Sequence, residues 1–352
     1  MGVKHTQRDS GNFRDTLAGW LVSGKVKSYH SSALGGMYVV PPWSEASGGN
    51  INGADPGDDY RYHLFSSPGT FVIPGTKPGS ITFDVLLIGG GGAGGACDTS
   101  NGSGGGGAGG VVHHSQLDAS GTLTVTVGPG AAAPTSNNVV GANGSDSTLV
   151  SPTAPWTITA KGGGGGGYYG TVGSPGGSGG GGGGYGLNYS YAHTTASQPT
   201  QNPTFAPDPN FNQYGNIGGA PSDDNPGNAG GGGGSGTVGG SHPAAEGGPV
   251  ASGGGAGQPF TGFPGALPGF TPMPAPWISA VGPTGLYGGG GAGENPYSGG
   301  STAAGGAGGG GSGPAPNAIA NTGGGGGGND PASTASGSGG SGICIIRYKG
   351  TA

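Results

Sequence analysis

The chain carries few charges and almost no basic residues over its second half. Only 10 of its 352 residues are Lys or Arg, and none of them lies between Lys161 and Arg347. Because proteins bind nucleic acids by neutralising phosphates with Lys and Arg, we expect no nucleic-acid partner. The sequence also lacks the run of about 18 apolar residues that a membrane-spanning helix needs, and its polar start, Met1–Ser10, lacks the apolar core of a signal peptide. We therefore expect no membrane insertion.

Cysteine is nearly absent as well. The two cysteines, Cys97 and Cys344, are too few for the disulfide framework typical of small secreted domains. Two free thiols are favoured, and a single Cys97–Cys344 bridge is the alternative.

No motif identifies a cofactor, a metal or a catalytic centre. Ile81–Ala96 contains the G-x-G-x-x-G pattern of dinucleotide-binding folds, but any long glycine run satisfies it, and the residues that follow cannot form the required helix. His113 and His114 would point to opposite faces of a strand. The pairs Asp58–Asp59 and Asp223–Asp224 lack the spacing of a calcium loop. We therefore predict no cofactor, no metal and no enzymatic activity.

The chain has glycine in excess, 96 residues gathered largely in runs such as Gly162–Gly167, Gly179–Gly184 and Gly323–Gly328. Ordering each backbone residue costs about 1–2 kcal/mol, and glycine gains no side-chain packing in return. Continuous runs lack the every-third-residue spacing of collagen, which leaves the extended, left-handed polyproline II helix, made here of glycine. That helix has no internal hydrogen bonds, so we predict a bundle in which polyglycine II helices bond to one another. A flexible Gly/Ser linker is the alternative.

Between the glycine runs lie short segments with the pattern of β-strands. Ile81–Ile88 is almost wholly apolar, as in a central buried strand, and Thr122–Val127 alternates strictly. The last such segment, Ile343–Tyr348, is expected to pair in the same sheet as Ile81–Ile88. The sequence thus predicts an all-β fold, a jelly-roll-like β-sandwich with a large inserted bundle of polyglycine II helices. The predicted boundaries are 58–161 and 340–352 for the sandwich and 162–339 for the bundle.

Residues 1–57 form a separate segment of ordinary side-chain variety. They contain five of the ten basic residues. Asn12–Gly24 is the one helix that the sequence predicts, because Asn12 can cap it, apolar residues fall on one face and Gly24 can end it. A strand is expected within Met37–Trp43, followed by a loop over Ser44–Asp59.

Two loops between glycine runs, Tyr185–Asn216 and Gln258–Tyr287, are rich in aromatic and small polar residues. Such mixtures supply rigid contact area and adaptable hydrogen bonds, which is typical of recognition surfaces and suits sugar faces. An equal alternative is that the rings clip the loops onto the bundle. The candidate binding residues are Tyr185, Tyr189, Tyr191, Phe211, Tyr214, Phe263, Trp277 and Tyr287.

Residues 60–352 contain a series of distinctive segments in a fixed order. The series comprises an aromatic strand, a GTF strand, an apolar strand entering a glycine run, a second run, a TVTVG strand, an NGSDS turn, a further run and a terminal IIRY strand. These segments are Tyr60–Phe65, Gly69–Phe71, Val85–Gly92, Gly104–Val112, Thr124–Gly128, Asn143–Ser147, Ala160–Gly167 and Ser341–Tyr348. In this order the series resembles the glycine-rich domain of bacteriophage tail-fibre and related virion proteins.

The resemblance implies a virion-borne, extracellular tail-fibre or tail-tip protein. In adhesins of this kind, loops at the far end of the bundle bind the host surface, which points to the two aromatic loops and to a host glycan or protein as partner. Residues 1–57 fall outside the resemblance, and their basic, helix-bearing sequence predicts docking to other virion proteins. The candidate docking residues are Phe13, Arg14, Leu17, Trp20 and Leu21.

Two alternatives to host attachment stay open at this point. The chain would then be a purely structural virion component, such as a capsid decoration or fibre connector, or a non-viral secreted glycine-rich matrix or ice-binding protein. Homo-oligomerisation is also left open.

Overall fold

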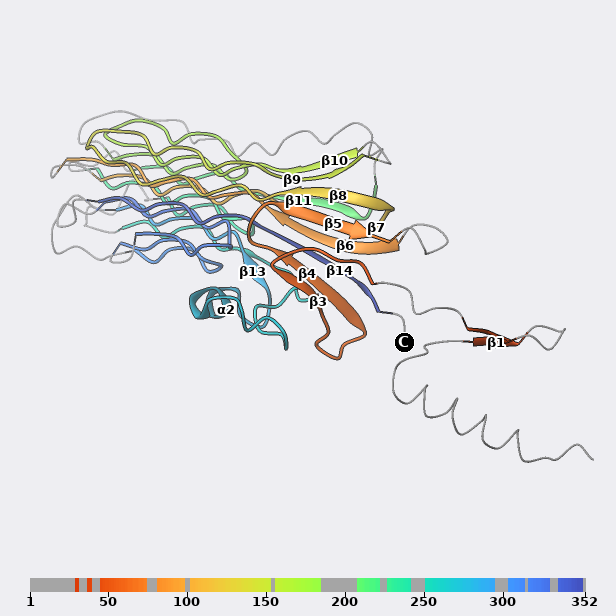
Figure 1. Ribbon diagram of the computed structural model, residues 1–352. Coiled ribbons are helices and arrows are strands. Elements are labelled where there is room, and N and C mark those ends of the chain that lie inside the picture. The colour runs from red at the N-terminus through yellow and green to blue at the C-terminus, as the bar shows by residue number, and fades with distance from the viewer. Residues whose placement is uncertain are drawn as a thin grey trace, which may run out of the picture.

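The two largest β-sheets of the described chain lie together, and a set of extended glycine tracts extends from them to one side (Figure 1). The computed structural model describes residues 29–31, 37–39, 45–74, 81–98, 102–152, 156–184, 208–221, 227–241, 251–294, 303–313, 316–329 and 335–350. The predicted helix Asn12–Gly24 lies outside these residues. β1 (Tyr29–Ser31) pairs with β2 (Met37–Val39), which confirms a strand at the start of the segment Met37–Trp43.

The larger sheet has six antiparallel strands in the order β11-β7-β6-β14-β4-β3. Their bounds are β3 Ile51–Ala54, β4 Tyr60–Phe65, β6 Ile81–Ile88, β7 Val111–Ala119, β11 Phe211–Tyr214 and β14 Ile343–Lys349. The C-terminal strand β14 lies between β6 and β4, with Ile345 opposite Leu86 and Arg347 opposite Asp84. The predicted pairing of the last strand with Ile81–Ile88 is therefore confirmed. β3 is a correction, because it lies inside the segment expected to be a loop and pairs with β4.

The smaller sheet has four antiparallel strands in the order β10-β9-β8-β5. Their bounds are β5 Gly69–Ile73, β8 Gly121–Thr126, β9 Ser147–Ser151 and β10 Trp156–Ala160. The inward side chains of both sheets form one core that includes Phe71, Phe83, Leu123, Ile158 and Ile346. Buried and exposed residues alternate along β8, because one face of that strand contacts the core and the other contacts solvent. The all-β, sandwich-like prediction is confirmed at this level.

The outer face of the six-stranded sheet is partly covered by residues 258–287. This covering segment contains β12 (Gln258–Pro259), the helix α2 (Ala275–Val281) and β13 (Leu286–Tyr287). It forms a second apolar core with the sheet, in which Trp277 and Phe263 pack with Leu86 and Ile345. The helix was not predicted from the sequence. It is only seven residues long, has proline in its first turn and ends at Gly282 with φ of 60°. Proline and glycine at these positions are as typical of a turn as of a short helix, so the sequence does not distinguish the two.

The glycine tracts are joined by backbone hydrogen bonds that follow a period of three residues. Tract 89–96 is one example, since every third N–H in it donates to the same neighbouring segment. Gly89, Gly92 and Gly95 donate to 104–110; Gly90, Ala93 and Ala96 donate to 139–145; Gly91 and Gly94 donate to 337–340. Three residues per turn would turn successive N–H groups toward three different neighbours in this way.

Tract 104–110 is enclosed by the other tracts. Its seven amides donate over 2.7–3.1 Å, at positions three apart, to the segments 161–167, 230–233 and 323–326. Its carbonyls accept from the amides of 89–95, of 178–181 and of Gly291. Six segments therefore bond to this one, and backbone groups that have no partner inside their own tract are satisfied between tracts.

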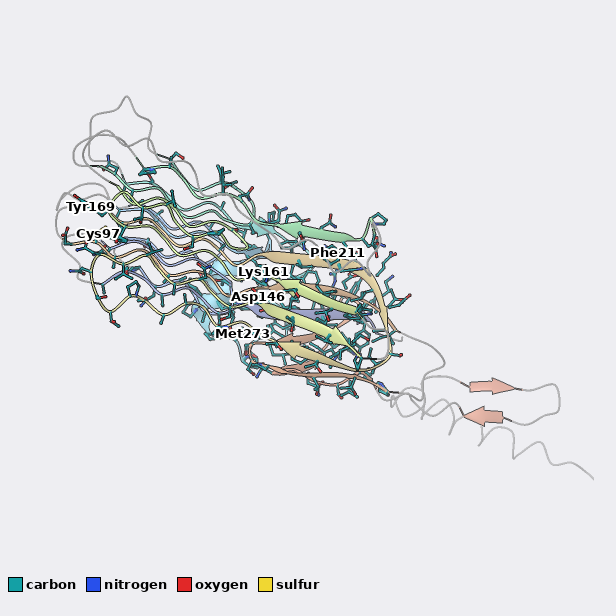
Figure 2. The ribbon with its side chains drawn as sticks, turned by 90° about the horizontal axis from the view of Figure 1, so that it is seen from above. Cys97, Asp146, Lys161, Tyr169, Phe211 and Met273 are labelled. Atoms are coloured by element: carbon teal, nitrogen blue, oxygen red, sulfur yellow. The ribbon has the colours of Figure 1, made fainter. Side chains whose placement is uncertain are left out.

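Side chains have almost no space inside this arrangement. A Cβ added at Gly106 or Gly181 would lie within 3.0 Å of a carbonyl oxygen of a neighbouring tract. Some tract amides donate to side chains instead of to neighbouring backbones. Asn143 accepts a hydrogen bond from the Gly165 amide at 2.9 Å, and Asp146 accepts one from the Gly162 amide at 2.9 Å. Asp146 also pairs with Lys161 at 2.7 Å where the sheets meet the tracts (Figure 2).

Candidate functional site

Three of the predicted binding residues lie in the second apolar core. Phe263 and Trp277 are 1% exposed, and Tyr287 is fully buried. Trp277 Nε1 donates to the Asn321 carbonyl at 2.8 Å, and the Tyr287 hydroxyl donates to the Phe263 carbonyl at 3.1 Å. These three rings fit the alternative in which aromatic side chains clip the loop, because burying their area against the sheet holds the covering segment in place.

Phe211 and Tyr214 lie on the edge strand β11 and are half-buried. Phe211 packs edge-on against His114, with ring centroids 5.6 Å apart, and Tyr214 packs edge-on against Phe260 at 5.3 Å. Each ring thus contributes to packing and keeps part of its surface accessible. His114 and His113 lie on opposite faces of β7, as predicted, and His113 packs against Phe260 and Phe263.

The other predicted residues lie outside the part of the chain that the structure describes. They are the candidate binding residues Tyr185, Tyr189 and Tyr191 and the candidate docking residues Phe13, Arg14, Leu17, Trp20 and Leu21.

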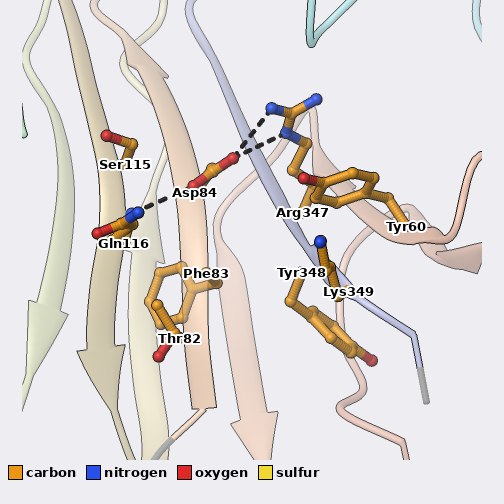
Figure 3. Close-up of a pocket in the computed structure, with 9 residues that line it drawn as sticks. All are labelled: Tyr60, Thr82, Phe83, Asp84, Ser115, Gln116, Arg347, Tyr348 and Lys349. Carbon is orange, nitrogen blue, oxygen red and sulfur yellow. Dashed lines mark hydrogen bonds and ion pairs between the residues drawn. The ribbon is translucent and has the colours of Figure 1, made fainter.

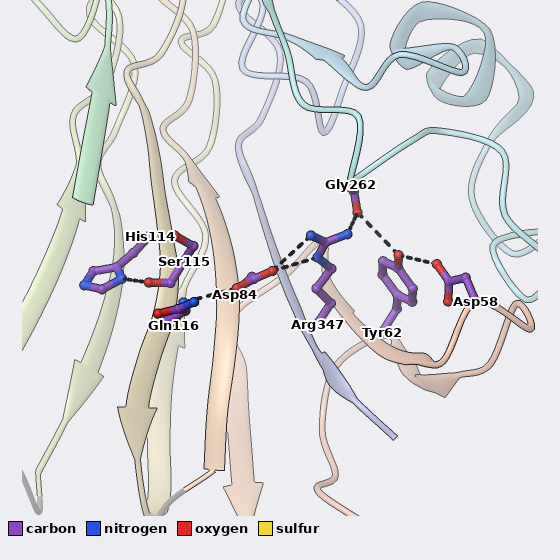
Figure 4. Close-up of polar contacts among 8 residues, drawn as sticks. All are labelled: Asp58, Tyr62, Asp84, His114, Ser115, Gln116, Gly262 and Arg347. Carbon is purple, nitrogen blue, oxygen red and sulfur yellow. Dashed lines mark hydrogen bonds and ion pairs between the residues drawn. The ribbon is translucent and has the colours of Figure 1, made fainter. Parts of the chain in front are cut away.

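Arg347 is the central residue of a polar network on the outer face of the large sheet (Figure 4). Its Nε and Nη2 both donate to Asp84 Oδ2 at 3.0 Å, and its Nη1 donates to the Gly262 carbonyl at 2.8 Å. The guanidinium also lies over the rings of Tyr60, at 4.5 Å, and Phe263, at 4.8 Å. A half-buried cation is stabilised by such a carboxylate and two aromatic faces. Arg347 therefore ties the C-terminal strand to the covering segment.

Tyr62 extends this network toward the loop that precedes β4. Its hydroxyl donates to Asp58 Oδ2 at 2.8 Å and lies 3.4 Å from the Gly262 carbonyl. Burial, together with the hydrogen bond to Asp58, raises the pKa of Tyr62 to about 12. The hydroxyl thus stays protonated and remains a donor throughout the physiological range.

A β-bulge in β7 lies beside Asp84. His114 pairs with Val85 and Leu117 pairs with Phe83, so that Ser115 and Gln116 together oppose Asp84. Gln116 has φ of 60°, a conformation that non-glycine residues rarely adopt. Its amide donates to Asp84 Oδ1 at 3.1 Å. The bulge therefore brings two consecutive residues of one strand beside the Asp84–Arg347 pair.

These residues line an open pocket of about 430 Å³ on the sheet (Figure 3). Tyr60, Arg347 and Lys349 lie to one side of Asp84, and Ser115 and Gln116 lie to the other. Thr82 lies two residues before Asp84 on β6, and its hydroxyl donates a hydrogen bond to Asp118 at 2.5 Å. The pocket combines hydroxyl, amide, carboxylate and cationic groups around an aromatic wall.

The ends of the tracts far from the sheets are held by a buried polar cluster. Asn329 accepts from the Cys97 amide and from the Ser103 hydroxyl, at 2.8 and 2.7 Å, and donates to the Cys97 carbonyl at 2.8 Å. The Tyr169 amide lies 3.3 Å from Cys97 Sγ, and both residues lie at this far end in Figure 2. Burial raises the pKa of Cys97 to about 12, so its thiol is not a reactive thiolate. Cys344 is likewise free and buried, which confirms two free thiols.

Sequence reasoning missed Asp84 and Arg347. Asp84 is the one charged side chain in β6, Arg347 follows the apolar residues Ile343–Ile346 of β14, and the two strands were predicted to pair. That combination was a usable signal, because a charge on a buried strand needs a partner on its neighbour. Gln116 had no comparable signal, since a bulge depends on the register of both strands.

Within the described residues, no group of three or more His, Cys, Asp or Glu side chains could hold a metal ion. The same part of the chain contains no helix long and apolar enough to cross a bilayer. The geometry is that of a β protein with an open pocket on one sheet and an attached array of glycine tracts.

The sequence pattern of a glycine-rich domain family matches residues 66–349. The chain belongs to that family. No curated protein matches the chain. The match begins within the turn between β4 and β5 and ends at the last residue of β14, so it spans the four-stranded sheet, the tracts and the closing strand.

Proposed function

We propose that the tracts are polyglycine II helices and that they form a stiff spacer in a virion tail-fibre or tail-tip protein that takes part in attachment to the host cell. The carrying observation is the three-residue period of the hydrogen bonds between tracts. Each bond contributes only about 0.5–1.5 kcal/mol net, but every tract makes several. At about 3.1 Å per residue, tracts of eight to ten residues would reach about 25–30 Å. Jelly-roll connectivity of the sandwich stays a prediction.

The two ends of this body differ in a way that suits the proposal. The described segment 45–74 joins the sheets near its start, where Ser47 forms a β-bridge with Val72 of β5. The tracts end at the far side, near Cys97 and Tyr169 (Figure 2). Docking to other virion proteins through residues 1–57 would occur at the first end, and contact with a host glycan or protein at the other.

The candidate contact residues are reassigned accordingly. Phe263, Trp277 and Tyr287 act as clips, because they are buried against the sheet. Phe211 and Tyr214 keep partial exposure but lie on the sheet, away from the far end of the tracts. Tyr185, Tyr189 and Tyr191 remain the proposed contact residues. Nothing in this function calls for enzymatic activity or a cofactor.

The test uses the complete protein and the particles produced by the genome that encodes it. Antibody raised against the recombinant chain should label purified particles at the fibre or tail tip, and the recombinant chain should block adsorption of those particles to host cells. Labelling without blocking would leave the purely structural virion role. No labelling of any particle would overturn the virion proposal and favour the secreted matrix protein.

A further inference from the structure

The pocket on the large sheet contains a non-glycine residue in a rarely adopted backbone conformation. Gln116 has an exposed side chain and φ of 60°. Glycine would adopt this backbone without strain, whereas other residues are held there at a cost of about 1 kcal/mol or more. Strain of this kind clusters at binding and catalytic sites, which makes Gln116 the starting point.

The hydrogen bonds around Asp84 leave one acceptor position open toward the pocket. A carboxylate offers about four acceptor positions. Arg347 occupies two on Oδ2 and the Gln116 amide occupies one on Oδ1. The Asp84 side chain is 18% exposed and lines the pocket, and Oδ1 accepts one hydrogen bond fewer than Oδ2. Ser115 and Gln116, the two residues of the bulge, both line the pocket.

The charges around the pocket favour an anion. Asp84 is already neutralised by Arg347, and both are held by the network of Figure 4. Lys349 is exposed at the end of β14, and no ion pair of its ammonium is found among the described residues. The lining thus combines fixed hydrogen-bonding groups for neutral hydroxyls with one cation that has no protein partner there.

We propose that this pocket binds a sugar unit that carries a carboxylate. Its hydroxyls bond to Asp84 Oδ1 and to the side chains of Gln116 and Ser115, and its carboxylate pairs with Lys349. The volume of about 430 Å³ lies in the range of small-ligand pockets, about 300–1,000 Å³, and fits one or two sugar rings. This site lies on the sheets, so it is independent of the proposed contact at the far end of the tracts.

Gln116→Gly is the decisive variant. Glycine suits φ of 60° and keeps the amide that donates to Asp84, so the variant removes only the side chain. The control is Asn138→Gly, which also replaces an exposed residue at φ of 60°, near the far end of the tracts, and additionally removes the acceptor of the Asp98 amide at 3.3 Å. Lys349→Gln removes the cation. Arg347 is left intact, because its loss would disturb the covering segment.

Binding is measured on the full chain by NMR titration with glucuronate, with glucose, and with a glucuronate-containing oligosaccharide. For a ligand of this size the usual affinity per atom gives a Kd on the order of 1 mM for glucuronate. The amides of Asp84, Gln116 and Lys349 should shift with glucuronate and not with glucose. Gln116→Gly should weaken binding about tenfold at an unchanged or higher Tm, because an exposed partner of a ligand hydroxyl is lost. Lys349→Gln should remove the preference for glucuronate over glucose.

Three results would overturn the proposal. These are no shift with either glucuronate or its oligosaccharide, equal shifts with glucose, and equal glucuronate affinity in Gln116→Gly and Asn138→Gly. If only the oligosaccharide binds, and Gln116→Gly weakens it, the site recognises the sugar acid within a polysaccharide. Because these measurements need no particle or host, their outcome is separate from that of the adsorption test.

Discussion

The sandwich and the glycine tracts show two ways of ordering one chain. In the sandwich, side chains from two sheets fill the space between them, as Phe71 and Phe83 do at a centroid distance of 5.8 Å. In the tracts, the space between neighbours is closed by the backbones themselves, and a Cβ at Gly106 would collide with the Gly92 carbonyl. The first region is stabilised mainly by burial of apolar area and the second by hydrogen bonds between segments. Substitutions should therefore act differently in the two regions.

Removing the closing strand should have the largest effect. Truncation after Gly340 deletes β14, which pairs with both β6 and β4 in the middle of the large sheet. The sheet would then expose two unpaired strand edges and lose Ile343, Ile345 and Ile346 from both cores. We expect no cooperative unfolding transition in this variant by circular dichroism. Unchanged hydrogen-exchange protection of Ile81–Ile88 would contradict the expectation.

A substitution in the covering segment tests stabilisation by buried side chains at a single residue. Trp277→Ala removes the largest fully buried side chain and leaves a cavity next to Phe270 and Tyr287. The expected loss is about 3–5 kcal/mol in the free energy of unfolding. Denaturant titration measures it, and adsorption of particles that carry the variant, corrected for the amount of folded protein, should be unchanged. A stable variant that fails to adsorb would return Trp277 to the binding residues.

A substitution in the glycine tracts tests stabilisation by close backbone packing and hydrogen bonds between segments. In Gly181→Val the new side chain meets the Gly230 carbonyl, while the Gly181 amide donates to Gly105. Because a backbone cannot yield as a flexible side chain can, we expect a loss of about 3 kcal/mol or slightly more in the free energy of unfolding.

The matched control for this substitution lies in another tract. At Gly253 the nearest atom to an added Cβ is the Ala304 carbonyl oxygen at 3.6 Å, an ordinary contact. Gly253→Ala should therefore change the free energy of unfolding by less than about 0.5 kcal/mol. Equal melting of Gly181→Val, Gly253→Ala and the parent would mean that the tracts behave as a flexible linker.

The smallest effect is a pH dependence that belongs to the sandwich. Burial lowers the pKa of His63 below the ordinary histidine value of 6.5, and the pKa of His113 is lowered for the same reason. Below about pH 6.5 these histidines bind more protons in the unfolded chain than in the folded chain. The free energy of unfolding is therefore highest above about pH 6.5 and falls as the pH drops toward the lowered pKa values. His63→Gln should flatten part of this slope, measured by Tm between pH 7.5 and pH 5.5 (about one unit either side of the unfolded value). An unchanged slope would mean that His63 does not contribute.

The sequence predicted the strands better than what surrounds them. The segments Ile81–Ile88 and Ile343–Tyr348 could be paired in advance because each is short and rich in apolar residues, and a continuous glycine run excludes most other conformations. α2 was missed because a seven-residue helix between Pro274 and Gly282 has too few turns to show a period. The roles of Phe263 and Trp277 depended on which face of the sheet remained uncovered, and no local pattern specifies that.

Hydrogen exchange at the tract amides tests the contrast between the two regions most directly. The amides of Gly104–Gly110 donate to three different segments and are buried, as are those of β6 in the sheet. If the tracts are ordered by backbone bonds alone, these glycine amides should exchange as slowly as the amides of Val85–Ile88 in the same native sample. Exchange at the rate of an unstructured glycine peptide, with Val85–Ile88 still protected, would contradict the ordered arrangement and leave the sandwich as the one stable part of the described chain.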